Sequence, residues 1–188
     1  MRVVGGALRG RRLGRPPEDV RPTSDRVRES LFAILGDLEG RAVLDLYAGT
    51  GSLGIEALSR GAQRAVFVDR SSRSLGVLRQ NLRELGLEDR SRAVRSEVLR
   101  RLRAWGRDGG PGPFDLVLLD PPYADTGICE VLEALLAGEL LSEASEVVVE
   151  CSKRNPWAAP EGFDQVDERR YGDTVLRRLR PAAPGRGT

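Results

Sequence analysis

From residue 41 onward, the apolar positions alternate between strand-like and helix-like spacing. Short apolar runs that predict strands lie at 42–47, 65–69, 92–96, 114–120 and 146–151. The clearest helical spacing is at 72–85, where Leu75, Leu78 and Leu82 recur and Gly86 follows as a stop. Residues 99–105 and 128–136 show similar helical spacing. Strands that alternate with helices predict right-handed crossovers and a doubly wound, mostly parallel α/β sheet.

The N-terminal part departs from this alternation and is strongly basic. Residues 2–4 and 11–13 flank a Gly-Gly stretch and predict a short hairpin, and residues 25–38 predict an amphipathic helix. Residues 1–30 hold eight arginines against four acids, although the whole chain carries a net charge of only +2. Such an arm suits RNA phosphates, and our candidate contacts are Arg9, Arg11, Arg12, Arg21, Arg26 and Arg28.

The arginines of this arm could also be present for reasons unrelated to RNA. Lys153 is the only lysine among 30 basic residues, so a general preference for arginine would also produce a basic arm. Arg26 could pair with Glu29, one helical turn further along, instead of meeting RNA.

The C-terminal part predicts an antiparallel hairpin. Strand-like runs at 164–171 and 174–180 are joined by Gly172-Asp173, which places antiparallel strands at one edge of the sheet. The last residues are rich in proline and glycine, and we expect them to be disordered. We therefore divide the chain into a basic N-terminal extension, a main domain and a tail, at 1–40, 41–180 and 181–188.

Composition excludes several classes of protein. A chain of 188 residues fits one domain, and no apolar run approaches the roughly 20 residues that span a bilayer. The N-terminus lacks the apolar core of a signal peptide, so we expect a cytoplasmic protein without a membrane partner. Histidine is absent, and two cysteines are too few for a zinc cluster, so we expect no metal.

A glycine-rich turn follows the first predicted strand of the main domain. Gly49, Gly51 and Gly54 form G-x-G-x-x-G between a strand and a helix, which is the context of a nucleotide-binding turn. Glycine there would allow a ligand to approach the backbone closely. Asp69 ends the next strand, 20 positions after Gly49, where a carboxylate could accept hydrogen bonds from ribose hydroxyls.

The acids around this turn favour S-adenosylmethionine over NAD. Asp45 lies within the strand that enters the turn, where a carboxylate would repel a pyrophosphate but suit a cationic amino acid. Glu97 follows the third strand and could bind the adenine amino group, although a glutamate at a helix start accounts for it nearly as well. The candidate cofactor contacts are Asp45, Tyr47, Gly49, Gly51, Asp69 and Glu97.

The motif Asp120-Pro121-Pro122-Tyr123 supplies the candidate catalytic residues. It ends a strand, which places it at the carboxyl edge of the sheet. An exocyclic base amine is a poor nucleophile, because its lone pair is delocalised into the ring. Asp120 and the Pro121 carbonyl could hold its hydrogens and turn the lone pair toward an electrophile, while a base stacks on Tyr123. An ordinary strand-ending turn is the alternative interpretation.

Several blocks of the sequence together resemble the RsmD family. They are Arg2–Gly6 with Arg9-Gly-Arg11, Arg21–Glu29, Asp45–Gly54, Asp120–Tyr123 and Tyr171–Thr174, in the family's order. The resemblance implies a class I S-adenosylmethionine-dependent methyltransferase, Rossmann-like, with a seven-stranded sheet and a basic N-terminal extension. It also implies methylation of guanine N2 in 16S ribosomal RNA, within the small subunit or its assembly intermediate. Asp69 and Glu97 depart from the acids common in the family.

Three further functions remain open at this point. An adenine N6 methyltransferase acting on DNA or RNA would use a similar strand-end motif. A nicotinamide oxidoreductase would use a similar glycine turn. A nucleic-acid-binding module with an inactive site is the third, although the intact motif at Asp120 argues against it.

Overall fold

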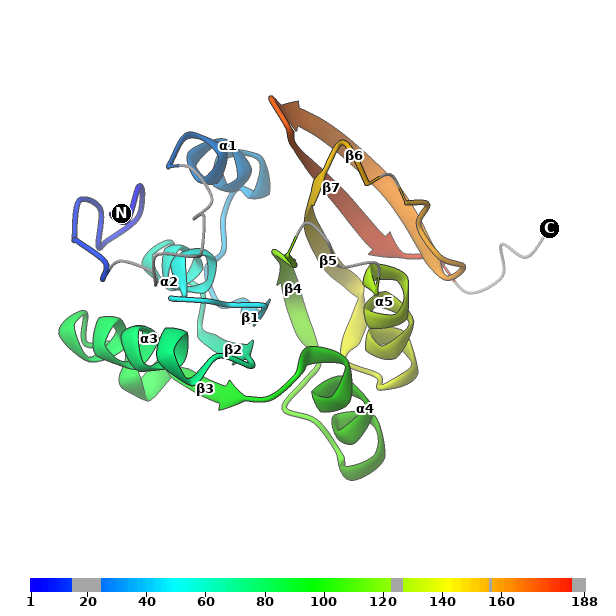
Figure 1. Ribbon diagram of the computed structural model, residues 1–188, viewed down its shortest axis with the longest axis horizontal. Helices are drawn as coiled ribbons and strands as arrows, with labels where there is room; N and C mark the ends of the chain where they lie inside the picture. Colours follow the sequence, from blue (N-terminus) through cyan, green and yellow to red (C-terminus); the bar gives the residue numbers. More distant parts are fainter. Residues whose placement is uncertain (15–24, 123–126, 156, 184–188) are drawn as a thin grey trace. The chain divides into compact units, whose positions relative to one another are not determined.

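The computed structural model describes residues 1–14, 25–122, 127–155 and 157–183. Two of the predicted site residues, Arg21 and Tyr123, lie outside these ranges, as do residues 184–188 of the predicted tail. The chain forms two compact units, Met1–Ser96 and Glu97–Thr188 (Figure 1). Across the described ranges, no helix has both the length and the apolar character needed to cross a membrane.

The first unit holds a parallel sheet of three strands in the order β3-β2-β1. Its elements are α1 (Asp25–Leu35), β1 (Ala42–Leu46), α2 (Ser52–Ser59), β2 (Arg64–Asp69), α3 (Ser72–Glu84), the 3-10 helix η1 (Glu88–Arg90) and β3 (Ser91–Arg95). The register pairs Leu44 with Val66, and Phe67 with Ala93. Because β1 and β2 run in parallel, the glycine turn after β1 and the acid that ends β2 come to the same edge.

The N-terminal arm, residues 1–14, is a hairpin that packs within the first unit. One antiparallel bridge joins Arg2 to Arg12, which confirms the predicted hairpin. Its tip is held on α2, where the Leu8 N–H donates to Ser59 Oγ at 2.9 Å and the Val4 N–H donates to Glu56 Oε2 at 2.8 Å. These two hydrogen bonds tie the tip of the arm to α2.

Helix α1 is shorter than its apolar pattern predicts. It ends at Leu35, and Gly36 takes a left-handed φ of 69°, the conformation in which glycine stops a helix. Leu38 is nevertheless fully buried, beyond the end of the helix. The apolar spacing identified Leu38 as a core residue but could not show that Leu38 lies in the loop after the helix.

The second unit holds a mixed sheet in the order β4-β5-β7-β6. Its elements are α4 (Val98–Asp108), β4 (Phe114–Leu119), α5 (Ile128–Ala137), β5 (Leu141–Ser152), β6 (Phe163–Tyr171) and β7 (Thr174–Pro181). Strands β4 and β5 are parallel, whereas β7 pairs antiparallel with both β5 and β6. The predicted C-terminal hairpin is confirmed, and β6 is its outer strand.

Strand β5 begins five residues before the apolar run that predicted it. Its register against β4 shifts, since Phe114 pairs with Leu141 and Leu116 pairs with Glu146. Ser145 holds this irregular stretch, because its hydroxyl donates to the Phe114 carbonyl at 2.6 Å and accepts the Ser142 N–H at 2.7 Å. Such a bulge depends on side-chain hydrogen bonds, which the apolar pattern does not register.

Candidate functional site

The glycine turn connects β1 to α2 through several left-handed residues. Tyr47 has a φ of 60°, Gly49 of 55° and Gly51 of 85°. The Gly51 N–H donates to the Ala48 carbonyl at 2.7 Å, which closes the turn, and Gly51 is the N-cap of α2. A non-glycine residue such as Tyr47 adopts this φ at a cost of about 1–3 kcal/mol, and strain of this kind clusters at functional sites.

The three glycines of the turn are needed for different reasons. A Cβ on Gly51 would lie 2.3 Å from Leu78 Cδ1, and one on Gly54 would lie 2.3 Å from Phe67 Cε1. Internal packing therefore requires glycine at these two positions, and the contact of Gly51 with a cofactor stays a prediction. Gly49 is different, because the nearest atom to its Cβ would be the Tyr47 carbonyl oxygen at 4.0 Å. The space in front of Gly49 is open, and a ligand can approach the backbone there.

Asp45 lies beneath the turn and holds the start of α2. Its side chain is buried, and Oδ2 accepts the Gly54 N–H at 2.9 Å. A helix start presents N–H groups and the positive end of the helix dipole, which offset the cost of burying this carboxylate. The structure thus brings Asp45 to the turn, as the sequence predicted, and shows a structural contact that the sequence did not reveal. Its contact with a cofactor stays a prediction.

Asp69 joins the end of β2 to the same turn. Its Oδ2 accepts the Gly49 N–H at 2.8 Å, and its Oδ1 accepts the Ser71 N–H at 2.7 Å. A carboxylate oxygen has two lone-pair sites, so each oxygen keeps capacity for a further donor such as a ribose hydroxyl. The side chain is half-buried, at the edge where the turn is open.

Glu97 begins the second unit, where it caps a helix. Its Oε1 accepts the Leu99 N–H at 3.1 Å, and its Oε2 accepts the Arg100 N–H at 2.7 Å. This is the arrangement of an N-cap, and α4 begins at the next residue, Val98. Glu97 is therefore the N-cap of α4, and its contact with adenine stays a prediction.

The motif at Asp120 follows directly after β4, which ends at Leu119. Asp120 is half-buried, Pro121 is buried and Pro122 is exposed. The motif thus lies at the carboxyl end of a strand that runs parallel to β5, the position predicted from the sequence. Its fourth residue, Tyr123, is outside the described residues.

Four of the candidate RNA contacts are exposed arginines of the first unit, on the arm and on α1. Arg9, Arg11, Arg12 and Arg26 are exposed, and Arg11 donates from Nη2 to the Glu84 carbonyl at 3.1 Å. The remaining donors of the Arg11 guanidinium can still meet a phosphate. The contacts of these arginines with RNA stay a prediction.

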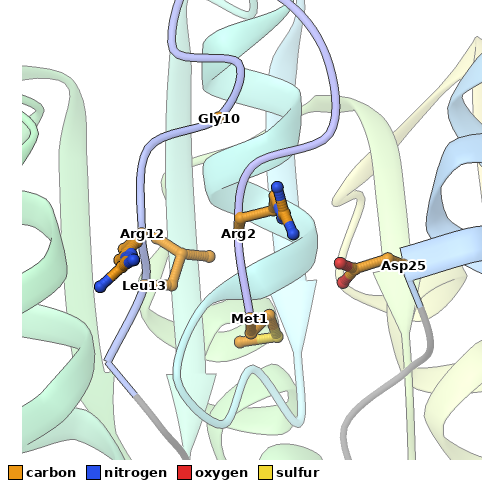
Figure 2. A pocket seen from close by; sticks show the side chains of 6 residues that line it. All are labelled: Met1, Arg2, Gly10, Arg12, Leu13 and Asp25. Carbon is orange, nitrogen blue, oxygen red and sulfur yellow. The ribbon is translucent and has the colours of Figure 1, made fainter.

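A hollow of about 470 Å³ lies where the arm faces the first residue of α1 (Figure 2). Its lining residues are Met1, Arg2, Gly10, Arg12, Leu13 and Asp25. Figure 2 shows the Arg2 side chain extending toward Asp25 and the Arg12 side chain pointing the other way. Arg2 is exposed and basic, and the sequence pattern missed it as a candidate although it stands opposite Arg12 in the predicted hairpin.

Arg28 is not at the surface, which corrects its assignment as an RNA contact. Its side chain is 0% exposed, and Nη2 donates to Asp25 Oδ1 at 2.8 Å and to the Arg2 carbonyl. Burial lowers the pKa of the Arg28 guanidinium, although the nearby Asp25 and Glu56 carboxylates act in the opposite direction. The helical spacing could have revealed this, since Arg28 shares a face with the buried Leu31 and Leu35.

The described parts of both units contain no group of three or more histidine, cysteine, aspartate or glutamate side chains that could hold a metal ion.

The fold and the turn define the class of protein. A strand, a glycine turn and a helix, followed by an acid at the end of the next strand, occur here in an α/β, Rossmann-like fold. The chain is similar to the solved structure of yhhF from Escherichia coli, with a TM-score of 0.83, 29% identity and coverage of 96% and 97% of the two chains. The solved structure of SMU.776, a complex with SAH, shows the same fold at a TM-score of 0.69 and 17% identity, over 82% of this chain and 48% of that one. The class is the Rossmann-like methyltransferases, and the fold-class prediction is confirmed.

The chain belongs to the RsmD family. The model of this family, described as Conserved hypothetical protein 95, matches residues 1–180. It is 34% identical over 188 residues to Ribosomal RNA small subunit methyltransferase D of Escherichia coli K12, covering 98% of this chain and 92% of that protein. It is 31% identical over 180 residues to the protein of that name from Haemophilus influenzae, covering 94% and 92%. The resemblance seen in the sequence is confirmed.

Proposed function

We propose that this protein transfers the methyl group of S-adenosylmethionine to the exocyclic N2 of a guanine in 16S ribosomal RNA. The observation that carries the proposal is the contact between Gly49 and Asp69, which joins an open glycine turn to a carboxylate at the end of β2. Membership of the RsmD family supports the reaction class and the ribosomal RNA substrate.

The first unit would hold the cofactor through residues that fit it chemically. The open space before Gly49 admits a ligand to the backbone, and Asp69 keeps lone pairs for the hydroxyls of a ribose. Asp45 lies beneath the turn with a carboxylate that suits a cationic amino acid. When bound, S-adenosylmethionine supplies an electrophilic methyl group on a sulfonium.

The motif at the end of β4 would hold the base. The Asp120 carboxylate accepts a hydrogen bond from the exocyclic amine, and the Pro121 carbonyl accepts a second. These acceptors turn the amine lone pair out of conjugation with the ring, and Tyr123 offers a face for stacking worth roughly 1–3 kcal/mol. Asp120 also serves as the general base for the proton that the amine loses after methyl transfer.

The substrate would be folded RNA within the small subunit or its assembly intermediate. The motif of four residues can grip one base but cannot read a long sequence, so recognition relies on the shape of the target. The base must leave its stack to react, which costs least in a loop where it is already unpaired. The exposed arginines of the arm supply phosphate contacts. Because the substrate is ribosomal, we place the reaction in the cytoplasm.

The test offers the purified enzyme three substrates with labelled S-adenosylmethionine. These are small-subunit particles from cells that lack the modification, protein-free 16S RNA and duplex DNA. We expect the particles to be labelled best, as N2-methylguanine at one loop nucleotide. The Asp120→Ala variant, mixed with the same particles, controls for a contaminating activity. Equal labelling of DNA, or label on adenine N6, would overturn the proposal.

A further inference from the structure

A buried asparagine on α3 touches both the N-terminal arm and the glycine turn. Asn81 is 2% exposed. Its Nδ2 donates to the Thr50 carbonyl at 3.0 Å, and its Oδ1 accepts the Gly14 N–H at 2.7 Å. Thr50 stands between Gly49 and Gly51, and Gly14 is the last residue of the arm. One side-chain amide therefore connects two segments to which we have given separate roles.

The orientation of this amide follows from its two partners. A backbone carbonyl can only accept and a backbone N–H can only donate, so Nδ2 must face Thr50 and Oδ1 must face Gly14. Exchanging the two ends of the amide would break both bonds together. Because the side chain is buried, losing either partner leaves a polar atom unpaired away from water.

The arm is docked on α3 by neighbouring contacts as well. Arg11 Nη2 donates to the Glu84 carbonyl on the same helix at 3.1 Å. A Cβ on Gly14 would lie 2.7 Å from Val77 Cγ1, so the arm backbone passes directly over α3. Movement of the arm away from α3 would therefore withdraw the Gly14 N–H from Asn81.

We propose that Asn81 is a positioning residue that couples docking of the arm to the conformation of the glycine turn. The inference rests on the proposed function, because it takes the turn as the cofactor site and the arm as an RNA contact. When the Gly14 N–H leaves, the amide loses one of the two partners that orient it, and the donor to the Thr50 carbonyl is held less firmly. The turn then samples other conformations and binds the cofactor more weakly.

Such coupling is reciprocal. If a docked arm strengthens cofactor binding, then a bound cofactor strengthens docking of the arm by the same factor. RNA that holds the arm against α3 would thereby favour the loaded enzyme. Asn81 gives the protein a way to bind cofactor and RNA together without a direct contact between the two ligands.

The experiment measures the affinity for S-adenosylhomocysteine by calorimetry. Gly14→Pro removes the N–H that Asn81 accepts. Gly14→Ala is its matched control, because both variants place a Cβ 2.7 Å from Val77 Cγ1 and 3.2 Å from Asn81 Oδ1, whereas only alanine keeps the N–H. We expect Gly14→Pro to bind about 3- to 10-fold more weakly than Gly14→Ala. Asn81→Asp keeps an acceptor for Gly14 but loses the donor to Thr50, and we expect a similar loss.

The decisive measurement is a double-mutant cycle. In an Asn81→Ala background, Gly14→Pro should weaken binding by less than about twofold, because the link is already broken. Urea unfolding of each variant reports its stability, and if Asn81→Ala fails to fold, the pair of Gly14 variants decides. Equal affinities of Gly14→Pro and Gly14→Ala would overturn the coupling while leaving the proposed function intact. A wild-type protein that binds no S-adenosylhomocysteine would instead refute the proposed function.

Discussion

Asp69 and Gly49 lie 20 residues apart in the sequence, yet Asp69 Oδ2 accepts the Gly49 N–H at 2.8 Å. This contact pins the glycine turn after β1 to the end of β2. The second oxygen of Asp69 is held by the Ser71 N–H, just before α3 begins. Both oxygens of the carboxylate are thus oriented by the backbone before any ligand binds, which is the preorganisation that a specific site needs.

Asp69→Ala should weaken binding of S-adenosylhomocysteine by roughly 10- to 100-fold, because a charged acceptor is worth about 1.5–3 kcal/mol. The same change frees the N–H groups of Gly49 and Ser71, so the free energy of unfolding should also fall. Calorimetry and urea unfolding measure the two effects. The exposed Asp89, changed to alanine, serves as the control. Unchanged affinity in Asp69→Ala would remove this residue from the cofactor site.

Two substitutions of Asp45 distinguish the effect of its negative charge from the effect of its hydrogen bond to Gly54. Asp45→Asn keeps an acceptor for the Gly54 N–H, whereas Asp45→Ala leaves that N–H without this partner. If the carboxylate attracts the cationic part of the cofactor, both variants should bind roughly 10- to 100-fold more weakly, and only the alanine variant should lose much stability. Wild-type affinity in Asp45→Asn would show that Asp45 serves the turn alone.

Asp120→Ala should lower the rate of methyl transfer by orders of magnitude with little change in cofactor affinity. The reason is that Asp120 is proposed to hold the reacting amine, whereas the proposed cofactor contacts Asp45, Gly49 and Asp69 lie in the first unit. Single-turnover transfer to small-subunit particles and calorimetry with S-adenosylhomocysteine measure the two quantities. Asp108→Ala, an exposed change at the end of α4, is the control. Near-normal turnover in Asp120→Ala would contradict the assignment of Asp120 as a catalytic residue.

The arm arginines should determine how strongly RNA binding depends on salt. Changing Arg9, Arg11 and Arg12 to glutamine should lower the log–log salt slope by roughly 2–3 units, because each lost phosphate contact releases about one counterion fewer. The matched control changes three exposed arginines of the C-terminal hairpin, Arg169, Arg170 and Arg180. We expect the control to leave the slope nearly unchanged. A slope that stays the same in the arm variant would make the arm purely structural.

Arg28 should behave differently from the arm arginines, because it is buried. Arg28→Ala removes the donor to Asp25 and to the Arg2 carbonyl and leaves a cavity beside Leu31, so it should cost about 2–4 kcal/mol in the free energy of unfolding. The salt slope of RNA binding should stay at its wild-type value in protein that remains folded. A fall in slope without loss of stability would restore Arg28 as a phosphate contact.

The sequence by itself determined the elements and the places where chemistry gathers. Strands β1, β2 and β4 were found because burial on both faces requires a run of apolar residues, as at Phe114–Leu119. The glycine turn and the motif at Asp120 were found because they follow such runs directly, and the carboxyl ends of parallel strands are where ligands bind. These signals are local, so they can be recognised without knowing which distant segments are in contact.

Only the tertiary structure decided which residues those signals serve. Gly51 and Gly54 are glycines because Leu78 and Phe67 pack against them, and neither neighbour is adjacent in the sequence. Arg28 is buried because its guanidinium donates to Asp25 and to the carbonyl of Arg2, which lies 26 residues away. Asn81 offers no motif at all, and its role depends on Gly14 and Thr50 meeting the two ends of one amide. Hydrogen bonds and close packing between distant segments arise only when the chain folds, so a pattern read along the chain cannot reveal them.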